Sequence, residues 1–222
     1  MARNVKAPLA AWIACAGALI LLAMAAYGID AAQRADATLL ARFAAHQGSG
    51  LGSLAELVAH LADPLSLLVL LAVACGIALR RGRPLDAAAA VVVVAGANLT
   101  SQILKVALAH PRFQAVLGHD QPAAAAFPSG HATAATSIAI AFAFVVPRDL
   151  RAAVAVAGAC FVAAVGCSVK VLAGHFPSDV LGGVLVASGW GFAVLAARRA
   201  AVKGGGSRRR AQVSSRPAIS VK

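Results

Sequence analysis

Six apolar stretches alternate with polar segments along the chain, and each comes near the ~20 residues that an α-helix needs to cross a bilayer core. Asp63-Pro64 interrupts the second stretch, so its spanning part is expected to begin near Leu65, after an interfacial helix. The pattern predicts an all-α protein, built as a bundle of six transmembrane helices. The approximate limits of the stretches are Leu9–Ile29, Leu57–Leu79, Ala87–Ala109, Ser129–Val146, Ala152–Val171 and Val180–Ala197.

The composition agrees with a membrane protein. Sixty per cent of the 222 residues are hydrophobic and 13% are charged, whereas soluble domains carry about 25% charged residues. The first stretch follows Arg3 and Lys6, but no small-x-small cleavage site leads into soluble sequence, so we expect a retained helix rather than a signal peptide. Residues 1–200 are therefore predicted to form one transmembrane domain. Residues 201–222 are basic, polar and low in complexity, which is typical of a disordered tail.

The distribution of positive charge predicts the orientation in the membrane. With the N-terminus inside, 15 of the 20 Lys and Arg residues fall in inner segments. Because cytoplasmic loops carry the excess of Lys and Arg, both termini are expected to be cytoplasmic. The inner residues are Arg3, Lys6, Arg80, Arg81, Arg83, Arg148, Arg151, Arg198, Arg199, Lys203, Arg208, Arg209, Arg210, Arg216 and Lys222, and the outer ones are Arg34, Arg42, Lys105, Arg112 and Lys170.

The net charge of +12 does not indicate a nucleic acid partner. The basic residues stand at the ends of apolar stretches and in the tail, and no aromatic residues are interleaved with the charges of the tail. The cysteines lie inside apolar stretches and form no CxxC pair, so neither a disulfide framework nor a structural zinc site is expected. They are Cys15, Cys75, Cys160 and Cys167.

With this orientation, the titratable side chains gather at the outer face of the membrane. All six histidines lie there or at its interface, with six of the eight acidic residues, while the inner loops are short and mostly basic. An active site is therefore expected on the extracytoplasmic side. The residues are His46, His60, His110, His119, His131 and His175, with Asp30, Asp36, Glu56, Asp63, Asp120 and Asp179.

Lys105 and Arg112 form the first of three polar clusters at outer helix ends. The two residues are seven apart, so on a helix they share one face, and Pro111 between them bends the chain. A lysine point charge beside the planar fork of an arginine suits a phosphoryl group. Taken alone, the pair is better explained as two interfacial anchors that reach to the headgroups.

The second cluster, Pro128-Ser129-Gly130-His131, opens the fourth apolar stretch. Proline and serine are typical of a helix start, and glycine lets backbone N–H groups approach a ligand. The unpaired N–H groups and the positive end of the helix dipole form an anion site. His131 would stand there as a proton donor, or, on the plainer interpretation, as an interfacial histidine beside a capping turn.

His175 and Asp179 belong to the third cluster and are four residues apart, so on a helix their side chains can meet. A carboxylate bonded to one imidazole nitrogen fixes the tautomer and frees the other nitrogen, and histidine is a nucleophile towards phosphorus. Alternatives are an interfacial hydrogen-bonded pair, or Asp179 as a helix cap. Neither an HExxH motif nor a carboxylate-rich cluster is present, so no metal or other cofactor is expected.

The three clusters together resemble the phosphatidic acid phosphatase type 2 (PAP2) superfamily, which includes vanadium haloperoxidases. Its signature is Lys-x6-Arg-Pro, then Pro-Ser-Gly-His, then Ser-Arg-x5-His-x3-Asp. The chain has Lys105-x6-Arg112, an intact Pro128-Ser129-Gly130-His131, and Ser168-x6-His175-x3-Asp179 in the same order. The resemblance extends over about Ala87 to Ala197.

The resemblance implies a mechanism without a metal. His175 would attack phosphorus to form a phosphohistidine, Asp179 would orient it, and His131 would protonate the leaving lipid oxygen. Water would then hydrolyse the intermediate. The phosphoryl oxygens would be held by Lys105, Arg112, Ser129 and the backbone N–H of Gly130.

The chain departs from the signature at two positions. Phe113 stands where the family has proline after the arginine. Val169 occupies the place of the third-motif arginine, a phosphate ligand in the family. The adjacent Lys170 points about 100° away on a regular helix, and we regard Lys170 and His110 as auxiliary candidates.

The favoured activity is hydrolysis of a lipid phosphate or diphosphate presented from the outer leaflet of a bacterial inner membrane, with a polyprenyl diphosphate such as undecaprenyl diphosphate as first choice. Phosphatidic acid and phosphatidylglycerol phosphate are the alternatives in the same class. A further alternative is a homologue that has lost catalytic activity and binds or moves phospholipid, and Val169 is the feature that favours it. A transporter is disfavoured because the charged groups gather at one boundary rather than near mid-membrane.

Overall fold

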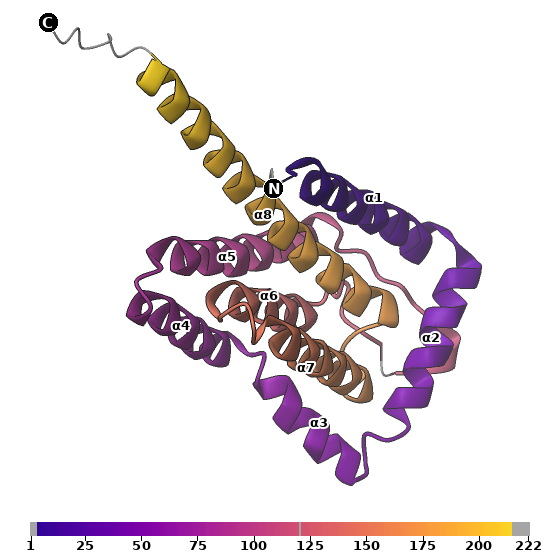
Figure 1. Ribbon diagram of the computed structural model, residues 1–222. Coiled ribbons are helices and arrows are strands. Elements are labelled where there is room, and N and C mark those ends of the chain that lie inside the picture. Colours follow the sequence, from indigo (N-terminus) through magenta and orange to yellow (C-terminus); the bar gives the residue numbers. More distant parts are fainter. Residues whose placement is uncertain (1–3, 120, 215–222) are drawn as a thin grey trace, which may run out of the picture.

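The computed structural model describes residues 4–119 and 121–214, and that part of the chain is helical without any β-strand (Figure 1). The all-α prediction is confirmed. The helices are α1 (Lys6–Gly28), α2 (Asp30–Ala44), α3 (Gly50–His60), α4 (Pro64–Arg80), α5 (Pro84–Ala107), α6 (Gly130–Val145), α7 (Arg151–Val171) and α8 (Pro177–Ser214), with a single 3₁₀ turn, η1 (Ala115–Leu117).

Helix α6 is the centre of the bundle, with α4, α5, α7 and α8 packed around it (Figure 1). Its first half is buried and built largely from small side chains, such as Ala132, Ala134 and Ala135. Small residues let neighbouring helices approach closely, which is how helices pack where lipid rather than water surrounds them. The turn before α6, which carries the second motif, is therefore held inside the bundle.

The described residues contain four helices long and apolar enough to cross a membrane: α1, α5, α7 and the Pro177–Val202 part of α8. The pair α3 and α4, bent by 51° at a short break, is a fifth candidate span, and α6 is apolar but shorter. Large apolar side chains on the outside of these helices are exposed, including Leu21 of α1 and Leu68 of α4. Such surface is stable against lipid and not against water.

The break between α3 and α4 falls at the Asp63-Pro64 interruption that the sequence shows. Helix α2, in contrast, occupies a segment for which no element was predicted. It has an amphipathic pattern, and its buried residues Ala37 and Leu40 pack against Phe176, next to His175 in the chain. A helix that joins the ends of α1 and α3 thus also covers the start of α8.

Helix α8 is longer than the sixth apolar stretch in both directions. It begins at Pro177, since a proline fits the first turn of a helix, where its missing N–H costs nothing. It ends at Ser214, so residues 201–214 are helical where we expected a disordered tail. Composition alone was misleading here, because each residue added to an existing helix gains a hydrogen bond. The rest of the predicted tail, 215–222, lies outside the described residues.

Candidate active site

The three motifs meet where α6 and α8 begin. The backbone N–H of Ser129, just before α6, donates to the carbonyl of Asp179 in the first turn of α8 over 2.9 Å. The rings of His131 and His175 lie 6.3 Å apart between centroids, with their planes 67° apart. Segments distant in sequence thus place two histidines, His131 of the second motif and His175 of the third, opposite each other.

Two glycines of α8 allow this approach. A Cβ added at Gly183 would lie 2.6 Å from the carbonyl oxygen of Ser129, and one at Gly182 would lie 2.8 Å from the ring of Phe127. The first of these neighbours is backbone and cannot move aside independently. Only glycine permits α8 to lie this close to the start of α6, which fixes the spacing between the second and third motifs.

His175 lies in the loop between α7 and α8, not on a helix with Asp179 as we expected. The chain leaves α7 through a left-handed turn at Ala173, where φ is 54°, and α8 begins only at Pro177. The two side chains still face each other: Nδ1 of His175 is 3.6 Å from Oδ2 of Asp179. That Nδ1 is buried without a hydrogen-bond partner. A small closure would complete the bond, as often happens when a substrate binds.

The expectation that Lys105 and Arg112 share a helical face was wrong. Helix α5 ends at Ala107, and Arg112 lies in the irregular segment that follows. The reason is Pro111, which disfavours helical backbone at the residue before it. Lys105 therefore stays on the last turn of α5, while Arg112 reaches a different part of the site.

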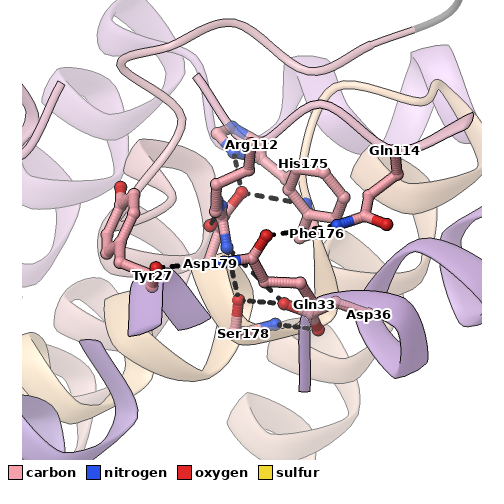
Figure 2. A network of polar contacts seen from close by, with 9 residues as sticks. All are labelled: Tyr27, Gln33, Asp36, Arg112, Gln114, His175, Phe176, Ser178 and Asp179. Carbon is pink, nitrogen blue, oxygen red and sulfur yellow. Dashed lines mark hydrogen bonds and ion pairs between the residues drawn. The ribbon is translucent and has the colours of Figure 1, made fainter. Parts of the chain in front are cut away.

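Arg112 is buried within a network of acceptors around the start of α8 (Figure 2). One terminal nitrogen pairs with Oδ1 of Asp179, and the other donates to Oγ of Ser178 over 3.0 Å and lies 3.5 Å from Oδ2 of Asp36. Its guanidinium group is stacked between the rings of Tyr27 and Phe176, at 5.0 and 4.3 Å from their centroids. Arg112 thus binds the carboxylate that faces His175.

Asp36 of α2 extends this network (Figure 2). Its carboxyl group accepts from the backbone N–H of Ser178 over 3.1 Å and from the Ser178 hydroxyl. Burial raises the pKa of Asp36 above its ordinary value, and the bonds from Ser178 and the charge of Arg112 offset this only in part. The amphipathic helix α2 therefore holds the first turn of α8 through a carboxyl group that is costly to ionise.

Asp36→Asn should flatten the dependence of stability on pH. Because the pKa of Asp36 is raised in the folded protein, its contribution is complete below the unfolded-state pKa and is lost as pH rises through the folded-state pKa. The Tm advantage of wild type over Asp36→Asn, measured in detergent, should therefore shrink from about pH 4 upwards. Asp30→Asn, at an exposed position of the same helix, is the matched control. A Tm difference that does not change with pH would contradict this assignment.

His131 is held from the break between α3 and α4. Its Nε2 lies 3.2 Å from Oδ1 of Asp63, and Oδ2 of Asp63 lies 2.7 Å from Nδ1 of His60. His60 is well exposed, whereas the side chains of His131 and Asp63 are about one-third exposed. Each of the two facing histidines thus has a carboxylate of its own.

The start of α6 brings several hydrogen-bond donors together. Ser129 is fully buried, and its hydroxyl caps the helix by accepting from the N–H of Ala132 over 3.4 Å. Nζ of Lys105 and Nε2 of Gln102 lie 3.6 and 3.9 Å from the point where a Cβ would project from Gly130. An ammonium and an amide therefore lie near the first turn of α6, next to His131 in the chain, where helical N–H groups can bind an anion.

The two auxiliary candidates lie away from this spot. Nζ of Lys170 is 4.2 Å from the centroid of the Phe43 ring on α2. His110 is exposed, with Nδ1 2.9 Å from the carbonyl oxygen of Pro111. Val169, in the place of the family's arginine, is buried at the end of α7, and its carbonyl accepts from the N–H of Gly174. Within 4–119 and 121–214, no three His, Cys, Asp or Glu side chains are placed to hold a metal ion.

Four residues of the site were not predicted as site residues from the sequence: Gln102, Asp36, Asp63 and Ser178. Asp36 and Asp63 appeared only as members of an acidic set on one membrane face, and nothing in their spacing links them to the three motifs. A partial signal existed for Gln102, which is one helical turn before Lys105 and so shares its face.

Comparisons with known proteins identify a family and a solved structure of similar fold. A family model described as the PAP2 superfamily matches residues 86–203. Among solved structures, the chain is similar to the crystal structure of "the first transmembrane PAP2 type phosphatidylglycerolphosphate phosphatase from Bacillus subtilis". The TM-score is 0.71, with 23% sequence identity, and the match covers 82% of this chain and 93% of the other. No curated protein matches the chain in sequence.

Fold, apolar helices and site together define an integral membrane phosphatase. The chain belongs to the PAP2 superfamily, since the matched segment covers more than half of its length. The resemblance seen in the three motifs is thereby confirmed, and so is the expectation of a phosphatase embedded in a membrane.

Proposed function

We propose that the protein hydrolyses a lipid phosphate or diphosphate through a phosphohistidine on His175, without a metal. One observation carries the proposal: His175 and His131 face each other beside the start of α6, each with its own carboxylate. A nucleophile and an acid on opposite sides of an anion site suit an in-line displacement at phosphorus.

The proposed reaction has two steps. With Nδ1 of His175 towards Asp179, Nε2 is the nitrogen that attacks phosphorus. The bond from phosphorus to the lipid oxygen breaks, and that oxygen takes a proton from His131. Water then attacks the phosphohistidine and gives a proton to His131, which releases inorganic phosphate and restores both histidines.

The negative charge that develops on the phosphoryl oxygens needs donors fixed in advance. We assign this role to Lys105, Ser129, the N–H of Gly130 and Arg112. Arg112 differs from the others, because its terminal nitrogens already face Asp179, Ser178 and Asp36. We propose that Arg112 contributes mainly a positive charge, separated from His175 by the carboxylate of Asp179, and that it orients that carboxylate.

An apolar pocket of about 530 Å³ lies between α2, α3 and α7 and supports a lipid as the substrate. Leu39, Phe43 and Leu54 line it, Arg42 and His46 are among its few polar members, and it reaches Ser168 of the third motif. A hydrocarbon chain would be stable there, while basic side chains near the headgroup attract an anionic lipid.

The arrangement in the membrane remains part of this proposal. It has six spans within residues 1–200, with the bent pair α3 and α4 as one and α6 as another, and both termini in the cytoplasm. The start of α6 and of α8 then lies at the extracytoplasmic face of a bacterial inner membrane. With the four native cysteines replaced by alanine, a single cysteine added near Lys6 or near His119 and labelled with a membrane-impermeant reagent tests it: only the second should react in intact cells.

The preferred substrate is a polyprenyl diphosphate such as undecaprenyl diphosphate, for which an outward-facing site fits. Phosphatidylglycerol phosphate, named for the similar Bacillus subtilis structure, and phosphatidic acid are the alternatives. Phosphate release from all three by purified protein, with and without EDTA, distinguishes them. Activity that EDTA abolishes would overturn the metal-independent mechanism, and no release from any substrate would favour a lapsed, lipid-binding homologue with Val169 as its cause.

His131→Ala should slow substrates with poor leaving groups far more than activated ones. General acid catalysis raises a rate by about 10²–10⁴-fold. The aryloxide of an aryl phosphate is a good leaving group and departs without taking a proton. The ratio of kcat/KM between a lipid monophosphate and p-nitrophenyl phosphate should therefore fall strongly in the variant. Equal losses on both substrates would contradict the acid role.

A further inference from the structure

We propose that Asp63 is a positioning residue for His131 and that His60 holds Asp63 in place. None of the three motifs contains either residue. The inference rests on the proposed function, because it assigns a support to the acid of that reaction. The juxtaposition is direct: one carboxyl oxygen of Asp63 lies 3.2 Å from Nε2 of His131, and the other lies 2.7 Å from Nδ1 of His60.

The local backbone favours this use of Asp63. The residue stands at the N-cap of α4, with Pro64 as the first helical residue, yet its side chain makes no capping bond. An aspartate there ordinarily accepts from the N–H groups of the first turn. Asp63 instead directs both oxygens to histidines, and one of them is on a different part of the bundle.

The break that carries Asp63 is anchored to the helix that carries His131. Ala62 is buried against Ala134 and Ala135 of α6 and Val165 of α7. The hydroxyl of Ser66 donates to the carbonyl of His60 over 2.7 Å and ties the two sides of the break together. The carboxylate is therefore fixed relative to His131, as a residue that orients a catalytic group must be.

The chemistry that results concerns the proton on His131. A carboxylate at Nε2 accepts the N–H of that nitrogen and leaves Nδ1 for the substrate, which fixes the tautomer. It also stabilises the imidazolium form that an acid needs. The other charged or titratable groups near His131 are Lys105 from α5 and His175 from the α7–α8 loop. The positive charge of Lys105 acts in the opposite sense, and Asp63 is the carboxylate that opposes it.

The test compares leaving groups in the full-length protein in detergent. In Asp63→Asn, kcat/KM for a lipid monophosphate should fall about tenfold or more, as expected when part of general acid catalysis is lost. For p-nitrophenyl phosphate the loss should stay below about threefold, because that leaving group needs no proton. Asparagine is itself a good N-cap, so Tm should change little. Glu56→Gln, an exposed carboxylate on α3, is the matched control and should leave both rates unchanged.

Three further variants keep the test independent of folding. Asp63→Glu, which retains the carboxylate, should recover part of the lipid phosphatase activity, and His60→Ala should give the same selective loss at smaller size. In a His131→Ala background, Asp63→Asn should cause no additional loss, since Asp63 acts through His131.

Equal losses on both substrates, or an additional loss in the His131→Ala background, would show a merely structural role and overturn the inference. These outcomes differ from a failure of the proposed function. That failure would appear as wild type without phosphatase activity, or as activity that survives His175→Ala.

Discussion

Replacing His175 with alanine should abolish turnover, with a loss of about 10⁴-fold or more in kcat, the size seen when a nucleophile is removed. The ring of His175 lies across from that of His131, with 6.3 Å between the two centroids. Phosphate release from a lipid monophosphate measures the loss. A rapid quench in alkali, which preserves phosphohistidine, should trap labelled protein in wild type and none in the variant.

The control must separate chemistry from folding, because His175 is largely buried. Its Nδ1 has no hydrogen-bond partner, so His175→Asn, closer in shape than alanine, should keep the protein folded in the membrane and still inactive. His119→Ala, an exposed histidine on the segment before α6, should leave the rate unchanged. Turnover that persists in both His175 variants would refute the mechanism.

The second largest effect is expected for Asp179→Asn, with kcat lowered about 10²–10⁴-fold, because an amide cannot fix the tautomer of the histidine it faces. Asp179 is fully buried, pairs with Arg112 and accepts from the N–H of Phe176 over 2.8 Å. Stability should fall too, by about 3–5 kcal/mol, because a buried cation loses a partner. Asp36 remains beside Arg112, which favours the lower end of that range.

A double variant distinguishes these two roles of Asp179. Adding Arg112→Met to Asp179→Asn removes the unpaired charge, so thermal stability should partly return while activity stays lost. Asp149→Asn, an exposed carboxylate in the turn between α6 and α7, serves as the control for loss of one negative charge. A double variant that regained both stability and activity would reduce Asp179 to a structural role.

Local features of the site were predictable because short-range chemistry governs them. Ser129 caps α6 as the Pro-Ser-Gly-His pattern indicates, and Asp63-Pro64 separates α3 from α4. The prediction failed where a helix was assumed to continue. Pro111 ends α5 early, so Arg112 leaves the helix of Lys105, and α8 begins only after His175, at Pro177.

The partners of the catalytic groups were beyond the reach of sequence patterns. Asp36 comes from a segment in which no helix was expected, and it reaches Ser178 across 142 positions of the chain. Asp63 and His131 are 68 positions apart. No periodicity connects such residues, since their contact depends on how α2 and the α3–α4 break pack against the bundle.

The sequence by itself determined the class of the protein: the apolar stretches, the three motifs and hence the two histidines on which the proposed chemistry depends. Hydrophobic length and nearest-turn geometry are local properties, and a single chain carries them in full. The tertiary structure alone decided which carboxylate faces which histidine, and that Arg112 binds Asp179 and Ser178. Those pairings follow from helix packing, where Gly183 lets α8 approach Ser129, and packing is a property of the whole bundle.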